Sequence, residues 1–376
     1  MKSKKKILVI SSSRSDYSLL KSLIFELKKE KKINTEVIAT GSHLEKRFGN
    51  TYKEIVKDKI HINKKIFLNL KTSTHKNIIS AISLGIKKFF NLFNKKKPDA
   101  IVILGDRYEI LSVAYAAHIL KINIFHFAGG EKTPYVYDDA IRNCLSILSN
   151  YHFVAHKKYK KNLIKMGINS NYIFDVGSLG IDNIKLIKRY SKKKILKKYN
   201  LEDKNKFFII TYHATTLFSK RQIISETKNL ILALDDFKDY NKIFTLPTAD
   251  FANDEVSKII INYCKQNKIA NYYTSLGSEN YLNLARFSEL IIGNSSSGIS
   301  EIPSLKKISL NIGSRQKGRI YGNSVINSNA NIVSIKKNIK KALILSKKIN
   351  YIKKIKNPYG DGNSSKKAVN IIKKMI

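Results

Sequence analysis

Short apolar runs alternate with helical patterns along the chain, and this alternation constrains the fold more than any other feature of the sequence. The first series of runs is "KKILVIS" at 5–11, "TEVIAT" at 35–40, "AIVIL" at 100–104, "INIFHFA" at 122–128, "YHFVA" at 151–155 and "YIFDV" at 172–176. Such runs are too short for helices and too apolar for half-exposed strands, so they predict buried strands of a parallel sheet. Strands that alternate with helices are typical of a doubly wound fold.

A second series of runs follows a lysine-rich stretch at 185–206 and comprises "FFIIT" at 207–211, "KIFTL" at 242–246, "NYYT" at 271–274, "ELIIG" at 289–293 and "KISLNI" at 307–312. We therefore predict an α/β protein with two similar, Rossmann-like doubly wound domains. The predicted parts are an N-terminal domain at 1–177, a linker at 178–206, a C-terminal domain at 207–360 and a closing C-terminal helix at 361–376.

The formal net charge of +42 raises the question of nucleic-acid binding. Of the 70 basic residues, 61 are lysines spread through the chain, and five of the nine arginines fall in the polar turns described below. Proteins that read nucleic acids concentrate arginine for bidentate contacts, so we predict no nucleic-acid partner. An anionic small-molecule substrate is compatible with the positive field of the chain.

The sequence contains no window of eighteen apolar residues, and its first residues lead directly into a strand pattern. We therefore expect a cytoplasmic protein that does not associate with membranes. The two cysteines, Cys144 and Cys264, lie in apolar helical patterns, and we expect both to be inert buried thiols.

Carboxylates follow two adjacent strands of the predicted first domain, at the edge where open α/β sheets bind ligands. Asp106 follows the run at 100–104, and Glu131 and Asp138 follow the next run. Proton transfer needs an acid and a base on opposite sides of one substrate, so we predict that these three residues carry it. The alternative is a network of ion pairs with Arg107 and Arg142 that only ties the loops together.

The first strand is followed by the hydroxyl-rich turn "SSSRSDYS" at 11–18, which contains Arg14. A turn of this kind at the amino end of a helix is suited to binding a phosphate group. Serines at such a turn are equally typical helix caps, so both interpretations stay open.

Three polar turns follow strands of the predicted second domain. They are "ITYHATT", with His213; "GNSSSGISE", with Asn294, Ser295, Ser296, Gly298 and Glu301; and "GSRQKGR", with Arg315 and Arg319. A Gly- and Ser-rich turn between strand and helix offers amides and hydroxyls to a diphosphate, and a carboxylate in the following helix accepts hydrogen bonds from a ribose. Arginines bind phosphate oxygens bidentately. These turns predict a nucleotide site that requires no metal.

Taken together, "LGDRYE", "HFAGGEKT", "DDAIRN", "VGSLG", "GNSSSGISEIPSL" and "NIGSRQKGR" resemble the hydrolysing UDP-N-acetylglucosamine 2-epimerases of sialic and legionaminic acid synthesis. The resemblance runs in order from "SSSRSDY" to "NSVI" at 323–326. It implies a GT-B fold, in which two Rossmann-like domains face a cleft and the C-terminal domain holds the nucleotide. It also implies a homo-oligomer, dimer or tetramer, with a UDP-sugar substrate and no cofactor.

The chemistry implied by the resemblance is removal of the proton on carbon 2 of the sugar with loss of UDP, followed by hydration to the free 2-epimeric sugar. The substrate is UDP-N-acetylglucosamine or UDP-N,N'-diacetylbacillosamine. By resemblance, Asp106, Glu131 and Asp138 are the acid–base candidates, and His213 lies near the diphosphate. The implied nucleotide-binding residues are Arg14, Asn294, Ser295, Ser296, Gly298, Glu301, Arg315 and Arg319.

The sequence departs from the family pattern at two places. Ala128 stands where many relatives carry Glu, and the usual His-Pro-Glu-Thr is replaced by His213-Ala214-Thr215-Thr216. Two other functions remain open on the same fold: a non-hydrolysing 2-epimerase, which returns a UDP-sugar, and a glycosyltransferase, which needs an acceptor.

Overall fold

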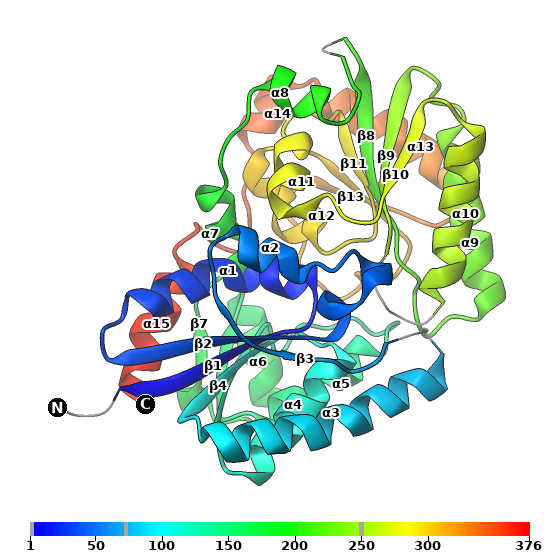
Figure 1. Cartoon of the computed structure of the whole chain (residues 1–376). Helices are drawn as coiled ribbons and strands as arrows, with labels where there is room; N and C mark the ends of the chain where they lie inside the picture. Colours follow the sequence, from blue (N-terminus) through cyan, green and yellow to red (C-terminus); the bar gives the residue numbers. More distant parts are fainter. Residues whose placement is uncertain (1–3, 71–73, 203, 248–251) are drawn as a thin grey trace. The chain divides into compact units, whose positions relative to one another are not determined.

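The protein divides into two compact units, each a parallel sheet between layers of helices (Figure 1). The structure is a computed structural model that describes residues 4–70, 74–202, 204–247 and 252–376. The first unit comprises Met1–Lys132, Tyr137–Leu186 and Tyr359–Ile376, and the second comprises Thr133–Val136 and Ile187–Pro358. The predicted α/β class with two doubly wound parts is confirmed.

The first sheet has the strand order β3-β2-β1-β4-β5-β6-β7, and its neighbouring strands are parallel. Its strands are β1 (Lys5–Ser11), β2 (Ile33–Thr40), β3 (Ile62–Ile66), β4 (Ala100–Leu104), β5 (Asn123–Phe127), β6 (Tyr151–Val154) and β7 (Ile173–Asp175). The order reverses between β1 and β4. Ligands of open α/β sheets bind beside the carboxyl ends of the strands at such a reversal.

Helices cover both faces of the first sheet because successive residues of a strand point to opposite sides. Ile7 and Val9 of β1 pack in one core layer, and Leu8 and Ile10 pack in the other. The helices of this unit are α1 (Arg14–Lys29), α2 (Tyr52–Lys57), α3 (His75–Lys96), α4 (Tyr108–Ile119), α5 (Asp138–Leu148), α6 (Lys157–Lys165), α7 (Leu179–Leu186) and α15 (Ser364–Met375), with short 3-10 turns at Gly41–Leu44, Lys46–Phe48 and Ser170–Tyr172.

The chain returns to the first unit at its C-terminal end. The Asp182 carboxylate accepts hydrogen bonds from the backbone N–H groups of Ser364 (3.0 Å) and Ser365 (2.6 Å), which open α15. Helix α15 then packs its buried face, which includes Ala368 and Ile372, into the core layer of α1. The closing helix expected from the sequence is therefore part of the first unit.

The second sheet has the strand order β10-β9-β8-β11-β12-β13, again with parallel neighbours. Its strands are β8 (Lys206–Thr211), β9 (Tyr240–Thr245), β10 (Ala270–Tyr273), β11 (Leu290–Gly293), β12 (Ser309–Ile312) and β13 (Val325–Ser328). Its helices are α8 (Lys192–Lys197), α9 (Lys220–Leu234), α10 (Asn253–Gln266), α11 (Gly277–Ala285), α12 (Ser297–Ser300), α13 (Ile332–Ser346) and α14 (Ile349–Lys353), with a 3-10 turn at Ile302–Leu305. Here the order reverses between β8 and β11.

Every apolar run named in the sequence coincides with a strand to within two residues at either end. The structure adds β3 and β13, which the sequence analysis did not predict. The segment 178–206, expected to be a linker, carries α7 and α8, and the two compact units divide at Leu186 and Pro358. The domain limits predicted from the sequence, at 177, 206 and 360, stay predictions.

Two further observations concern the surface. Cys144 is exposed on α5, so the expectation of a buried thiol is wrong there: its position faces away from the sheet, whereas its neighbour Leu145 packs inward. Cys264 is partly buried, and this burial raises the pKa of its thiol to about 12. In the part of the chain that the structure describes, no helix has the length and apolar character needed to cross a bilayer.

Candidate functional site

Asp106 lies at the carboxyl end of β4, where the order of the first sheet reverses. The turn before it is held by His126, whose Nε2 donates a hydrogen bond to the backbone oxygen of Gly105 (2.9 Å). The Asp106 carboxylate forms an ion pair with Arg142, a side chain that is only 1% exposed. Because His126 holds the turn and Arg142 binds the carboxylate, the Asp106 side chain has a defined direction at the sheet edge.

Arg142 connects three parts of the first unit. Besides Asp106, its guanidinium donates through Nη1 to the backbone oxygen of Glu131 (2.9 Å), and it lies 3.4 Å from the Asp139 carboxylate. Asp138 begins α5, the helix that carries Arg142 one turn later. Two of the three predicted acid–base residues are thus held by one buried guanidinium, and the third opens the same helix.

The turn before Glu131 has a backbone that few residues can adopt. Gly130 has a φ of +74°, and a Cβ there would lie 2.4 Å from the backbone oxygen of Tyr159. Ala128 has a φ of +63°, in the left-handed region that non-glycine residues rarely occupy. Such strain persists only where the surrounding structure enforces it and is common at functional sites. The path of the chain into Glu131 is therefore fixed by its backbone.

The other two charged residues after β4 pair with each other. Arg107 Nη2 lies 3.1 Å from Glu109 Oε1, and the Glu109 side chain is fully buried. Burial raises the pKa of the Glu109 carboxyl, and the Arg107 charge opposes this rise. Both arginines of the alternative interpretation therefore form ion pairs, Arg107 with Glu109 and Arg142 with Asp106.

One serine of the turn after β1, Ser13, is the N-cap of α1. Ser13 Oγ accepts a hydrogen bond from the backbone N–H of Asp16 (3.3 Å) at the start of α1. Ser12 donates to the Asp16 carboxylate through both its backbone N–H (3.1 Å) and its hydroxyl (2.5 Å). The capping interpretation holds for Ser13, whereas Ser12 binds the Asp16 side chain. Arg14, the first residue of α1, is the half-buried cation of this turn.

Burial lowers the pKa of His126 to about 4, below the value of about 6.5 in an unfolded chain. Below pH 6.5 the unfolded chain therefore binds a proton that the folded protein does not, and stability falls as the pH falls toward 4. From pH 7 to pH 5, the free energy of unfolding should fall by about 1–2 kcal/mol less in His126→Gln than in wild type. Urea unfolding at both values measures this difference.

The matched control for this variant is His61→Gln, because His61 is exposed. It should show the same loss as wild type. An equal loss in His126→Gln and wild type would contradict the assigned neutral state of His126. The comparison between variants also cancels the opposite contribution of Asp16 and Glu109, whose pKa values burial raises.

Asn294 is the centre of the corresponding edge in the second unit. Its side chain accepts a hydrogen bond from the backbone N–H of His213 (2.8 Å) and donates one to the backbone oxygen of the same residue (2.8 Å). Its own backbone oxygen accepts from Gln316 Nε2 (2.8 Å) and Arg315 Nη1 (3.2 Å). One residue thus fixes the chain at the ends of β8, β11 and β12.

Gly293 allows β11 to approach β8 at this point. It has a φ of +136°, and a Cβ there would lie 1.9 Å from the backbone oxygen of Thr211, a distance no side chain can occupy. Asn294 N–H donates to that same oxygen (3.1 Å). The glycine therefore allows the contact between strand ends that brings Asn294 against His213.

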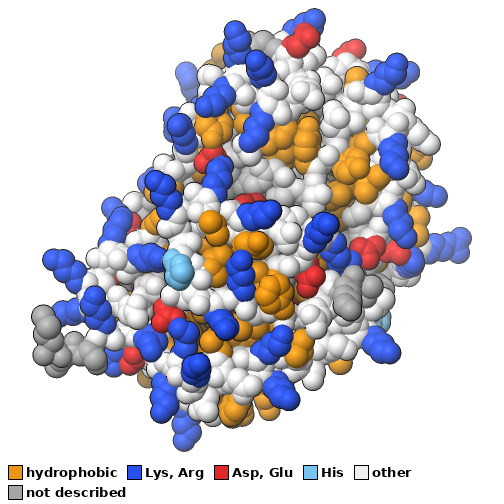
Figure 2. All heavy atoms as spheres, viewed as in Figure 1, with side chains coloured by type: hydrophobic (Ala, Val, Ile, Leu, Met, Phe, Trp, Pro, Cys, Tyr) orange, Lys and Arg blue, Asp and Glu red, His pale blue; other side chains and the backbone are white. Residues whose placement is uncertain are grey.

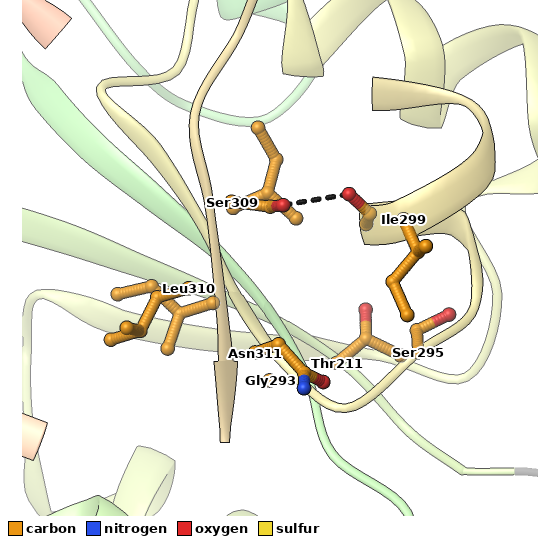
Figure 3. A pocket seen from close by; sticks show the side chains of 10 residues that line it. Thr211, Gly293, Ser295, Ile299, Ser309, Leu310 and Asn311 are labelled. Carbon is orange, nitrogen blue, oxygen red and sulfur yellow. Dashed lines mark hydrogen bonds between the residues drawn. The ribbon is translucent and has the colours of Figure 1, made fainter. Parts of the chain in front are cut away.

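The Ser-rich turn lies over the strands of the second sheet, as Figure 3 shows. The cavity beneath it, lined by Thr211, Gly293, Ser295 and Ile299 among others, is about 10 Å³, room for one water at most. Ser309 Oγ fastens the turn by donating to the backbone oxygen of Gly298 (2.6 Å). A nucleotide would therefore have to bind on the outer side of this turn.

Ser296 precedes α12, and Glu301 follows it, almost completely buried. Burial raises the pKa of the Glu301 carboxyl, and the neighbouring Ser297 hydroxyl opposes this rise. The expectation that Glu301 lies inside this helix is wrong by one residue, since α12 ends at Ser300 and Glu301 is its C-cap.

The turn after β12 carries both candidate arginines. It is closed by hydrogen bonds from the backbone N–H of Lys317 to Ser314 O (2.9 Å) and from that of Arg319 to Gln316 O (3.2 Å). Arg315 and His213 meet at Asn294, whereas Arg14 belongs to the other compact unit.

The structure adds two residues to the candidates predicted from the sequence, Arg142 and Gln316. Arg142 stands three residues after Asp139 and four residues after Asp138. Charged side chains at this spacing meet on a helix, so the sequence contained a pattern that could have identified Arg142. Gln316 is buried against Asn294, a contact across 22 residues that no local pattern indicates.

Comparison with known proteins shows the family and the fold of the chain. The sequence pattern of the family described as UDP-N-acetylglucosamine 2-epimerase matches residues 25–373. The chain is 40% identical over 330 residues to a Campylobacter jejuni protein named GDP/UDP-N,N'-diacetylbacillosamine 2-epimerase (hydrolyzing), covering 88% of this chain and 85% of the relative. It is 36% identical to the Escherichia coli polysialic acid biosynthesis protein P7, covering 99% and 94%. The structure of a Neisseria meningitidis UDP-GlcNAc 2-epimerase bound to UDP-GlcNAc superimposes with a TM-score of 0.83 at 21% identity, covering 98% and 100%.

Proposed function

The chain belongs to the UDP-N-acetylglucosamine 2-epimerase family, and from this premise we propose that it is a hydrolysing UDP-sugar 2-epimerase. It converts the nucleotide sugar into UDP and the free sugar with inverted configuration at carbon 2. The observation that carries the proposal is the group of carboxylates at adjacent strand ends, where the buried Arg142 binds the Asp106 carboxylate and the backbone oxygen of Glu131. A site that only binds phosphate would not need these carboxylates.

The proposed reaction has two steps. In the first, a base takes the proton from carbon 2, a double bond forms between carbons 1 and 2, and UDP leaves with the electrons of its bond to carbon 1. In the second, an acid returns a proton to the opposite face of carbon 2, and water adds its oxygen to carbon 1 while its extra proton passes to a base. We assign these proton transfers to Asp106, Glu131 and Asp138, since each step needs an acid–base group on a defined side.

The nucleotide is assigned to the second unit, with Arg14 as the contribution of the first. Ser295, Ser296 and Gly298 would offer donors to the diphosphate, Arg315 and Arg319 would neutralise its charge, and Glu301 would accept ribose hydroxyls. We place His213 beside the departing diphosphate. Since the Asn294 side chain already bonds to the backbone of His213, we assign Asn294 the role of positioning that residue.

The names of the relatives support two sugars. The 40% identical protein is named for diacetylbacillosamine, which favours UDP-N,N'-diacetylbacillosamine and legionaminic acid synthesis. The 36% identical protein is named for polysialic acid, which favours UDP-N-acetylglucosamine and sialic acid synthesis. The first name also includes GDP, so the experiment must also test whether the nucleotide base is uracil or guanine.

Product analysis tests the proposed function. The protein is incubated with each UDP-sugar and with the GDP form of the diacetylbacillosamine, and products are followed by proton NMR. Free 2-epimeric sugar with the nucleoside diphosphate supports the proposal. A 2-epimeric sugar still bound to nucleotide would indicate a non-hydrolysing epimerase, and turnover only with an added acceptor would indicate a glycosyltransferase.

Arg319→Ala should weaken UDP binding by about 1.5–3 kcal/mol, the range for hydrogen bonds to charged groups. The matched control is Arg221→Ala, because Arg221 is an exposed arginine of the same unit outside the proposed site. Titration calorimetry with UDP measures both. If UDP affinity is unchanged in Arg319→Ala, the turn after β12 does not bind the diphosphate.

We also propose that the enzyme works as a homo-oligomer in the cytoplasm without a cofactor. Both cysteines are free thiols, as is typical of a reducing compartment.

A further inference from the structure

A cavity of about 490 Å³ lies in the first unit, at the amino ends of β6 and β7. Its walls come from the C-terminal end of α5, the start of β6, the turn after α6 and the residue before β7. Asp106 follows the carboxyl end of β4, so the cavity opens near the opposite edge of the same sheet. Its volume is in the range of small-molecule sites, about 300–1,000 Å³.

The lining of this cavity is uncharged. Lysine and arginine supply 70 of the 376 residues, and Figure 2 shows how widely basic side chains are spread over the face in view. The described residues that line the cavity nevertheless include no acid, lysine or arginine. An anion such as a nucleotide would lose its hydration there without gaining a cation. The cavity is therefore suited to an uncharged molecule.

His152 of β6 lines the cavity and is 1% exposed. Burial lowers the pKa of His152 to about 3, and the backbone oxygen of Ser149 opposes this shift. The ring is therefore neutral at pH 7, with one nitrogen that donates a hydrogen bond and one that accepts. Its Nδ1 has no hydrogen-bond partner among the described residues. Because buried polar atoms normally have a partner, this nitrogen indicates a ligand with a polar group.

Aromatic and apolar side chains form another part of the lining. The rings of Tyr151 and Tyr172 meet edge to face, with centroids 5.7 Å apart. Tyr172 is 47% exposed, so part of its ring is accessible. Met166 and Ile168, in the turn after α6, add apolar surface. A ligand that fits this lining combines polar groups with an apolar face.

We propose that this cavity binds the free N-acetylated sugar that the reaction releases and that the bound sugar slows turnover. The identity of the sugar rests on the proposed function. Such a sugar is uncharged, its hydroxyls can pair with His152, and the C–H face of its ring can pack on Tyr172. A purely apolar ligand would leave the polar lining unpaired, and a nucleotide would bring charge.

Ser146 connects the cavity with the candidate functional site. It lines the cavity, and its hydroxyl donates to the backbone oxygen of Arg142 (2.9 Å) and lies 3.3 Å from His126 Nδ1. A hydroxyl has one proton to donate, so these two acceptors share it, and a sugar oxygen would be a third. Arg142 and His126 hold Asp106 and the turn before it. Because a bound sugar would loosen these contacts, turnover should fall.

Ligand-detected NMR titration with N-acetylmannosamine tests the binding, with the full chain, without substrate and with UDP in excess. Wild type should bind the sugar with a dissociation constant on the order of 1 mM, as is usual for a small ligand with few polar contacts. Glucuronic acid, a sugar with a carboxylate, should bind at least about tenfold more weakly, because no cation lines the cavity.

Tyr172→Ala and His152→Phe should each raise the dissociation constant of N-acetylmannosamine at least about tenfold. The first change removes an aromatic wall, and the second replaces the polar ring with an apolar one. The matched control is Tyr115→Ala, because Tyr115 is also 47% exposed but lies on α4, outside the lining. It should bind the sugar as wild type does. Circular dichroism confirms that the variants are folded.

Turnover at saturating UDP-sugar tests the inhibition. Added N-acetylmannosamine should lower the turnover of wild type and of Tyr115→Ala, whereas Tyr172→Ala should keep its turnover. A sugar that acts only at the reaction site would inhibit all three proteins alike.

Four results would overturn the proposal. They are no binding of N-acetylmannosamine, binding that Tyr172→Ala and His152→Phe leave unchanged, tighter binding of glucuronic acid, and equal turnover of wild type with and without the sugar. Binding is measured without substrate, and product analysis measures the reaction without added sugar. Failure of the cavity to bind and failure of the proposed function are therefore distinguishable.

Discussion

Asp106→Asn should lower turnover by roughly two to four powers of ten while the fold remains intact, the range for loss of a positioned acid–base group. Asparagine has the same shape as aspartate and keeps an oxygen that can accept a hydrogen bond from Arg142, but it cannot exchange a proton. Steady-state kinetics with the UDP-sugar identified by product analysis measures the effect, and circular dichroism checks the fold.

Asp99→Asn is the matched control for this variant. Asp99 directly precedes β4, and its carboxylate binds Lys5 (3.0 Å) and the backbone N–H of Lys6 (2.8 Å) at the opposite edge of the sheet. We expect its turnover to be near that of wild type. Near-normal turnover in Asp106→Asn would remove Asp106 from the mechanism.

Arg142→Leu should lower the free energy of unfolding by about 2–4 kcal/mol, because removal of one partner of a buried ion pair strands the other. The expected loss is below the full range for buried pairs since the Asp106 side chain is 21% exposed and water can solvate it in part. The backbone oxygen of Glu131 would also lose its donor. Urea unfolding followed by circular dichroism measures the change.

Asp139→Asn is the control for Arg142→Leu, since the Asp139 carboxylate lies 3.4 Å from the guanidinium, farther than the backbone oxygen of Glu131 at 2.9 Å. It should cost less than about 1 kcal/mol. A similarly small loss in Arg142→Leu would mean that Arg142 does not hold the strand ends together. Turnover should fall in Arg142→Leu as well, because Asp106 loses the group that orients it.

Sequence patterns predicted the central strands of both sheets because these strands are buried on both faces and are therefore continuously apolar. The two strands that were missed, β3 and β13, both lie at sheet edges. Strand β3 has the sequence "INKKI", with Lys64 and Lys65 exposed, and edge strands commonly carry lysine. Strand β3 therefore has no continuous apolar run by which it can be recognised.

The location of the candidate site followed from one geometric rule, since parallel strands end at the same edge of a sheet. Its internal contacts did not follow. The bonds from Asn294 to His213 join residues 81 positions apart, and those from Asp182 to the start of α15 join residues 182 and 183 positions apart. A local sequence pattern cannot indicate such pairings, because the side chain of one residue meets the backbone of a distant residue only in the folded chain.

The central claim is that the reaction removes and replaces the proton on carbon 2, and the deuterium content of the product tests it most directly. The enzyme is incubated with its UDP-sugar in deuterated water, and the released sugar is examined by proton NMR. If elimination and hydration occur as proposed, the free 2-epimeric sugar must carry deuterium at carbon 2, because the returning proton comes from solvent. A free 2-epimeric sugar without deuterium there would contradict the proton-transfer roles of Asp106, Glu131 and Asp138, and a free sugar with unchanged configuration at carbon 2 would contradict epimerisation itself.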